Sequence, residues 1–266
     1  RGFKIKDSIK MKAIGIIPAR LGATRFPGKP MVPIHGMPMV GHCYHRTRLA
    51  SGITSTYVAT CDDEIAEYVN GIGGTAIMTS TKHTRATTRT AEAMERIEEE
   101  TGGQCDIVVM VQGDEPLILP ETIAETLHHF KDPDVEIVNI MSRIRTYDQF
   151  ADKNNVKVVV NLDNDALYFS RETIPSPWSG LKDLPMFMQT GIIAFRRDAL
   201  LRFNNMEETR LEQIESVDMN RVLETGGRIR MVPTNAVTIG VDTHQELKDA
   251  ELLMNEDLTL AKYLSL

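Results

Sequence analysis

Short apolar runs alternate with amphipathic segments through the first half of the chain. Four of these runs have the length and composition of buried strands: 12–17, 55–60, 75–79 and 106–112. Between and after them, periodic apolar positions bounded by acidic residues, proline and glycine predict helices over 37–51, 62–74, 87–103 and 120–130. This alternation is typical of βαβ units, so the sequence predicts an α/β fold with a mostly parallel sheet covered by helices.

The second half of the chain has a different pattern, because its apolar strands follow one another with fewer helices between them. Strands are predicted within 135–144, 156–171 and 188–200, and the second of these reads as a hairpin around the polar residues 163–165. A helix over 207–225, a strand over 228–234 and a helix from 243 complete the pattern. We therefore expect one α/β domain over 11–266, with an inserted antiparallel lobe at about 150–195.

Composition narrows the class of protein. The 266 residues are 42% hydrophobic and 25% charged with a net charge of −7, which argues against a nucleic-acid partner and makes any phosphate site local. The three cysteines show no C-x-x-C spacing and no run approaches the roughly 18 apolar residues of a membrane span, so we expect a cytoplasmic protein. Residues 1–10 are basic without an apolar core, and we interpret them as a tag remnant or loose extension before Met11.

The loop after the first predicted strand, within IIPARLGATRFPGKP at 16–30, carries three cations: Arg20, Arg25 and Lys29. A Walker A loop is excluded, since five residues instead of four separate the glycines and Pro30 stands where a Ser or Thr is required. Glycine lets the backbone approach an anion, and ligands of parallel sheets bind beyond the carboxyl ends of strands. The loop therefore predicts a polyphosphate site, with a solvated surface turn as the alternative.

Two aspartates follow other predicted strands. Asp114 lies in VQGDEP and Asp242 in GVDTHQEL, each after an apolar stretch. Mg²⁺ usually takes one or two carboxylates together with substrate phosphates, so this pair predicts a magnesium site. The alternatives are a turn residue for Asp114 and a helix cap for Asp242, with Thr243 as another residue able to cap that helix.

These motifs, with VKVVVN…ALYFSR…IP between them, resemble in order and separation the CMP-Kdo synthetase (3-deoxy-manno-octulosonate cytidylyltransferase) family over most of residues 12–255. The resemblance implies a nucleotidyltransferase-type three-layer α/β sandwich and a homodimer formed through the inserted lobe. It also implies Mg²⁺-dependent transfer of CMP from CTP to the anomeric hydroxyl of a small acidic sugar, Kdo or a variant, with release of pyrophosphate, in lipopolysaccharide biosynthesis.

The resemblance also implies site residues, position by position. Catalytic roles are implied for Arg20, Lys29 and Asp114, and metal binding for Asp114 and Asp242. Nucleotide contacts are implied for Pro18, Ala19, Arg20, Arg25, Lys29, Thr87, Arg89, Gln112 and Gly113. Acceptor contacts are implied for Gln112, Arg171, Gln189, Glu215 and Asp218.

Departures from the family pattern leave alternatives open. The family segment S-G-T-[DE]-R is RATTR at 85–89, and Gln189, Ile193 and Met219 replace a His, a Tyr and a Gln of the acceptor pocket. The acceptor is therefore Kdo in a rearranged pocket, or an amino-substituted Kdo, another 2-keto sugar acid or a small phosphonate. The altered 85–89 segment also leaves uridylyl or thymidylyl transfer open, and a non-catalytic nucleotide-binding homologue is the alternative from another class.

Overall fold

The structure is a computed structural model that describes residues 11–22, 26–178, 180, 186–236 and 239–264. Residues 1–10 and the predicted phosphate ligand Arg25 lie outside the described residues. The strands are β1 (Ala13–Pro18), β2 (Pro33–Ile34), β3 (Met37–Pro38), β4 (Ile53–Thr60), β5 (Ala76–Met78), β6 (Ile107–Val111), β7 (Ile137–Arg143), β8 (Lys157–Val160), β9 (Ala166–Ser170), β10 (Phe187–Arg196) and β11 (Arg230–Thr234). The α-helices are α1 (Met39–Arg48), α2 (Asp63–Gly71), α3 (Ala86–Thr101), α4 (Pro120–His128), α5 (Tyr147–Ala151), α6 (Arg197–Asn204), α7 (Arg210–Glu215), α8 (Met219–Glu224), α9 (His244–Met254) and α10 (Ala261–Leu264), with short 3₁₀ helices η1 (Lys29–Met31) and η2 (His129–Lys131).

The main sheet has the strand order β11-β7-β10-β6-β1-β4-β5. β1 pairs in parallel with β4 and β6, β4 with β5, and β11 with β7, whereas β10 runs antiparallel to both of its neighbours in this order. The expected α/β fold with a mostly parallel sheet is confirmed. Because β1 and β6 are adjacent and parallel, their carboxyl ends at Pro18 and Val111 lie at the same edge of the sheet.

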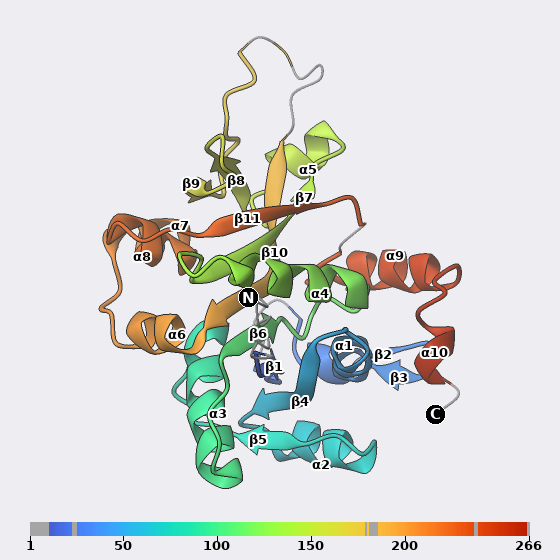
Figure 1. The fold of residues 1–266 in the computed structure, drawn as a ribbon. Helices are drawn as coiled ribbons and strands as arrows, with labels where there is room; N and C mark the ends of the chain where they lie inside the picture. The colour runs from blue at the N-terminus through green and yellow to red at the C-terminus, as the bar shows by residue number, and fades with distance from the viewer. Residues whose placement is uncertain (1–10, 23–25, 179, 181–185, 237–238, 265–266) are drawn as a thin grey trace, which may run out of the picture.

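Helices cover both faces of this sheet, with α3 and α6 on one side and α1 and α4 on the other (Figure 1). β6 shows why its sequence is an uninterrupted apolar run. Ile107, Val109 and Val111 pack into the core on the α1 side, and Val108 and Met110 pack into the core on the α3 side. Since both faces of the strand are buried, no position is left for a polar side chain. This gives the three-layer sandwich that the family resemblance implies.

A smaller antiparallel part, which we call the lobe, consists of α5, β8, β9 and the first residues of β10. β8 and β9 form the predicted hairpin, with Asn164 in the left-handed conformation at the turn (φ 61°). β8 also pairs with Phe187 and Met188 at the start of β10, so the lobe shares a strand with the main sheet. Figure 1 shows the hairpin and α5 beyond the upper edge of that sheet.

The prediction of one helix over 207–225 is wrong. The segment forms two short helices, α7 and α8, separated at Ser216, which adopts the left-handed conformation (φ 52°) and ends α7. A helix cannot continue through that conformation, so the chain turns here. The turn matters for function, because residues 216–218 line the cavity described next.

Candidate active site

A cavity of about 510 Å³ opens where β1 and β6 end. Its wall is built from the loops after these strands, the start of α3, the lobe, and the turn between α7 and α8. Most residues predicted from the sequence lie on this wall: Pro18, Ala19, Arg20, Lys29, Thr87, Arg89, Gln112, Gly113, Asp114, Arg171, Gln189, Asp218 and Asp242. The fold thus brings together side chains that are far apart in the sequence, and only Glu215 among the described predicted residues lies elsewhere.

Lys29 holds the two predicted metal ligands together. Its Nζ donates to Asp114 Oδ2 at 2.7 Å and to Asp242 Oδ1 at 2.9 Å, and its side chain is only 11% exposed. Burial lowers the pKa of Lys29, but the two carboxylates outweigh this and raise it above its usual value. In this structure Lys29 is therefore a charged ammonium bound to the aspartates, a contact that the sequence analysis did not anticipate.

Local backbone contacts explain this convergence. The Val241 N–H donates to the Asp114 carbonyl at 2.8 Å, which joins the segment before α9 to the loop after β6. Thr243 caps α9 by accepting a hydrogen bond from the Glu246 N–H at 3.2 Å. The cap therefore belongs to Thr243, and the Asp242 carboxylate contacts Lys29 instead.

The donor set fits Mg²⁺ bound jointly with a substrate. The two carboxylate oxygens lie no more than about 5.6 Å apart, because both contact one nitrogen atom. Within the described ranges, no group of three or more His, Cys, Asp or Glu residues could hold a metal ion. Two carboxylates therefore leave most of an octahedral shell to phosphate and water, as is usual for Mg²⁺.

Glu115 is a buried acid that the sequence analysis gave no role. The Gly191 N–H donates to its Oε1, and its Oε2 has no hydrogen-bond partner among the described residues. Burial raises the pKa of Glu115 to about 7. A side chain at Gly191 would place its Cβ 2.7 Å from Gln112 Cβ, so glycine is needed for this close approach of β10 to the loop after β6. In the sequence, the only indication of a role for Glu115 was its position next to Asp114 in the run Gly-Asp-Glu, and only tertiary packing shows which of these two acids is buried.

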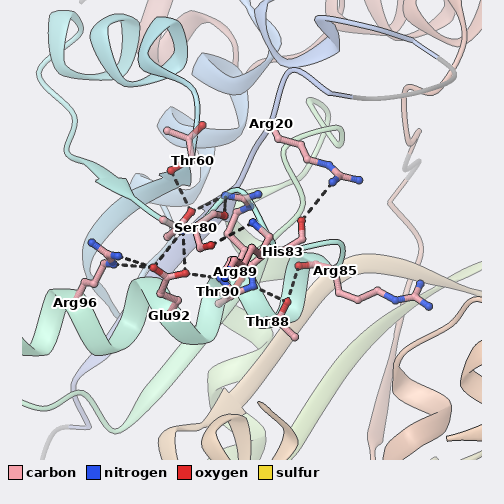
Figure 2. Close-up of polar contacts among 12 residues, drawn as sticks. Arg20, Thr60, Ser80, His83, Arg85, Thr88, Arg89, Thr90, Glu92 and Arg96 are labelled. Carbon is pink, nitrogen blue, oxygen red and sulfur yellow. Dashed lines mark hydrogen bonds and ion pairs between the residues drawn. The ribbon is translucent and has the colours of Figure 1, made fainter. Parts of the chain in front are cut away.

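Figure 2 shows the polar network around the first turns of α3. His83 contacts the Glu92 carboxylate and Thr88 Oγ1, and Arg20 donates to the His83 carbonyl at 3.3 Å. Burial raises the pKa of Glu92, but hydrogen bonds from the Ser80 N–H, His83 and Arg96 outweigh it and lower this pKa. The network therefore anchors the loop that supports Arg20, a function the sequence analysis did not assign to these residues.

Arg89 and Thr87 project from α3 toward the cavity. Arg89 Nη1 donates to Thr79 Oγ1 at 2.5 Å, while its buried Nη2 has no partner within the described residues. Thr87 Oγ1 donates to Asp218 Oδ2 at 2.6 Å. Thr87, a predicted nucleotide contact, is therefore hydrogen-bonded directly to Asp218, a predicted acceptor contact. Burial raises the pKa of Asp218.

The structure does not support the predicted contact of Glu215 with the acceptor. Glu215 does not line the cavity, because its carboxylate accepts hydrogen bonds from Tyr168 Oη (2.9 Å), Ser170 Oγ (2.7 Å) and the Arg171 N–H (2.8 Å). Burial raises the pKa of Glu215, but these bonds outweigh it and lower this pKa. Glu215 therefore holds the end of β9 in place and does not face the cavity.

Arg171 does line the cavity, but its guanidinium is engaged by the protein. It donates to the carbonyls of Glu215 at 2.7 Å, Lys153 at 2.9 Å and Ser216 at 3.3 Å. These bonds tie the lobe to the turn between α7 and α8. Arg171 is thus part of the wall itself, in addition to its predicted contact with the acceptor.

The three departures in the acceptor pocket lie in different environments. Gln189 Nε2 donates to Asn139 Oδ1 at 2.8 Å, and both Gln189 and the buried Ile193 line the cavity. Met219 is fully buried in the core and is not on the cavity wall. The interpretation of Met219 as a lost acceptor contact is therefore wrong, because this side chain packs inward from the start of α8.

Comparisons with known proteins identify the family. A family model described as cytidylyltransferase matches residues 14–229. The 3-deoxy-manno-octulosonate cytidylyltransferase of Geobacter metallireducens is 43% identical over 248 residues, covering 89% of this chain and 95% of the relative, and that of Escherichia coli is 37% identical over 247 residues, covering 93% and 98%. The solved structure of a CMP:2-keto-3-deoxy-manno-octonic acid synthetase complexed with CTP matches with a TM-score of 0.84 and 36% identity, covering 93% of this chain and all of that one. This chain belongs to the 3-deoxy-manno-octulosonate cytidylyltransferase family.

Proposed function

We propose that this protein transfers CMP from CTP to the anomeric hydroxyl of a 3-deoxy-2-keto sugar acid and releases pyrophosphate. The observation that carries this proposal is the convergence of Lys29, Asp114 and Asp242 on one cavity at the carboxyl ends of the strands. Relatives that share 37–43% of their residues with this chain bear the name of this activity, and the similar solved structure is complexed with CTP.

Arg20, Arg25 and Lys29 would contact the triphosphate, while Thr87, Arg89 and the loop residues Pro18, Ala19, Gln112 and Gly113 would contact the rest of the nucleotide. In the reaction, the anomeric hydroxyl releases its proton to solvent and its oxygen forms a bond to the α-phosphorus, while the bond from that phosphorus to the oxygen bridging to the β-phosphate breaks and pyrophosphate leaves. Negative charge grows on the phosphate oxygens, and cations held in place by the fold stabilise it. For Lys29 to act in this way, its ammonium must leave the carboxylates of Asp114 and Asp242 and contact phosphate oxygens instead.

Asp114 and Asp242 would hold Mg²⁺, which supplies charge neutralisation for the phosphates when it is bound. Support comes from the two convergent carboxylates, a donor set typical of Mg²⁺ with a nucleotide. Carboxylates that held Mg²⁺ would no longer be available to Lys29, so its ammonium could contact the triphosphate instead.

The acceptor would bind between Arg171, Gln189 and Asp218, all of which line the cavity. A guanidinium suits the carboxylate of a sugar acid. Ile193 favours an acceptor other than unmodified Kdo over Kdo itself, because an apolar side chain at this position offers no hydrogen bond to a substrate hydroxyl. The candidates are Kdo, an amino-substituted Kdo, another 2-keto sugar acid and a small phosphonate.

A substrate panel tests the proposal. Purified protein is incubated with Mg²⁺, one nucleoside triphosphate (CTP, UTP or dTTP) and one acid from the candidates, and pyrophosphate release is measured while the conjugate is identified by mass. We expect a CMP conjugate of a keto-sugar acid. Preference for UTP or dTTP would contradict cytidylyl transfer, and CTP binding without turnover of any acid would favour the non-catalytic alternative.

We further propose that the protein is a cytoplasmic homodimer whose product serves lipopolysaccharide synthesis. Leu162 and Leu167 on the lobe hairpin are exposed, at 102% and 59%, which supports association through the lobe. No helix in the described ranges has the length and apolar character needed to cross a membrane. Multi-angle light scattering of the wild type and of Leu162→Glu tests the dimer, and a monomeric wild type would contradict it.

A further inference from the structure

Lys157, at the start of β8, is a buried ammonium held by backbone carbonyls. Its side chain is 0% exposed, and Nζ donates to the carbonyls of Asp152 at 2.8 Å, Asn155 at 2.7 Å and Arg171 at 2.6 Å. Three acceptors satisfy all three N–H groups of an ammonium. None of these three acceptors is a carboxylate. The ammonium of Lys157 therefore holds backbone carbonyls in place and is not hydrogen-bonded to an acidic side chain.

The three carbonyls come from two separate segments. Asp152 and Asn155 lie in the loop between α5 and β8, and Arg171 follows β9. Both segments contribute to the lobe part of the cavity wall, through Asn154, Asn155 and Arg171. Lys157 is therefore the common contact of the segments that form this wall.

Further hydrogen bonds extend from these segments to the acceptor end of the cavity. The Gln189 N–H donates to the carbonyl of Val156, next to Lys157, at 2.8 Å. Arg171 Nη1 donates to the Lys153 carbonyl at 2.9 Å, and Nε reaches the Glu215 carbonyl. A displacement of the Lys157 ammonium would thus be transmitted to Gln189 and Arg171, both of them implied acceptor contacts.

We infer that Lys157 is a positioning residue that shapes the acceptor-facing wall of the cavity and thereby sets the affinity for the acceptor acid without affecting that for CTP. The inference rests on the proposed function. A neutral side chain of similar length leaves three carbonyls without their donor, and these carbonyls must move to find water or other donors. The nucleotide end of the cavity is built from β1, β6 and the start of α3, none of which contacts the Lys157 ammonium.

The test compares Lys157→Met with Lys153→Met. Both variants remove one positive charge from the lobe, but the Lys153 side chain is 71% exposed and pairs with Glu172 at the surface, at 2.6 Å. With Kdo as acceptor, or the best acid of the panel, we expect Lys157→Met to raise KM for the acid at least tenfold and to leave KM for CTP within twofold. Lys153→Met should leave both values within twofold of the wild type.

A second readout needs no turnover. Hydrogen–deuterium exchange should accelerate in peptides covering 152–156 and 171–173 in Lys157→Met, and remain unchanged in peptides covering 107–114. If Lys157→Met does not fold, Lys157→Gln replaces it, since the amide retains two donors on a shorter side chain. A wild type that turns over no acid would overturn the proposed function, while the exchange pattern still decides the positioning role.

Equal increases of both KM values, an acceptor KM within twofold of the wild type, or unchanged exchange at 152–156 would each overturn the inference. If KM rose by the same factor for the acid and for CTP, Lys157 would only stabilise the fold. A rise confined to the acceptor, together with local loosening of the lobe, is the result that a merely structural role would not produce.

Discussion

Replacing Lys29 with methionine should make the protein bind a divalent cation more tightly in the absence of nucleotide. In the structure, the ammonium contacts both Asp114 and Asp242, so any metal that uses these carboxylates must first displace it. A ligand that competes with an internal contact loses apparent affinity by the free energy of breaking that contact. Methionine has a similar length and no charge, so it removes the competitor while filling much of the same space.

The contact geometry sets the size of the effect. The two Nζ–oxygen distances of 2.7 and 2.9 Å are those of charge-assisted hydrogen bonds. The aspartate side chains are 25% and 26% exposed, so solvent screens part of the attraction. We therefore assign the pair the net value of a single hydrogen bond to a charged group, about 1.5–3 kcal/mol, and expect Mn²⁺ to bind roughly ten- to hundredfold more tightly.

Free Mn²⁺ measured by electron paramagnetic resonance, with protein but without nucleotide, gives the dissociation constant directly. Lys12→Met is the control, because it removes the same charge from an exposed position outside the cavity. The double variant Lys29→Met/Asp242→Asn should lose the gain. If Lys29→Met bound Mn²⁺ no more tightly than Lys12→Met, Lys29 would not compete with metal at these carboxylates. The same substitution should lower turnover, because the ammonium is also expected at the phosphates.

Three further predictions concern the site. Asp114→Asn and Asp242→Asn should each fold normally and lower turnover at least a hundredfold, about 2.7 kcal/mol in barrier, and near-wild-type rates in excess Mg²⁺ would refute the metal assignment. Lys29→Ala should mainly lower kcat, whereas Arg25→Ala should mainly raise KM for CTP, since a guanidinium fork suits terminal phosphate oxygens; steady-state kinetics that gave the reverse would contradict this division. Burial raises the pKa of Glu115 from 4.5 to about 7. The folded state therefore binds this proton more strongly than the unfolded state, and the resulting stabilisation, about 3 kcal/mol, is complete below pH 4.5 and lost as the pH rises to about 7. Urea unfolding from pH 4.5 to 7.5 should show this loss in the wild type relative to Glu115→Gln, and parallel curves for the two proteins would disprove it.

The sequence alone determined most strands and helices of the main sheet and its layers, and the edge of the sheet at which the site lies. The run 107–111 is apolar because β6 is buried on both faces, and this apolar run can be recognised in the amino-acid sequence. Asp114 follows β6 at the carboxyl end of that strand, as predicted, whereas the described residues between β11 and α9 form no strand, so Asp242 reaches the site from the segment just before α9. These features depend on local periodicity and on the general geometry of parallel sheets, which a single sequence carries.

Only the tertiary structure decided which side chain touches which. Lys29 lies 85 and 213 residues from its two carboxylate partners, and no local pattern encodes that contact. Glu115 and Met219 sit beside residues with predicted roles, yet one is a buried acid on the cavity wall and the other packs into the core. Glu215 supports β9, and Ser216 ends a helix where the apolar pattern continues. Burial and hydrogen bonding of these residues are set by packing between distant segments, which is why their roles appear only when the chain is folded.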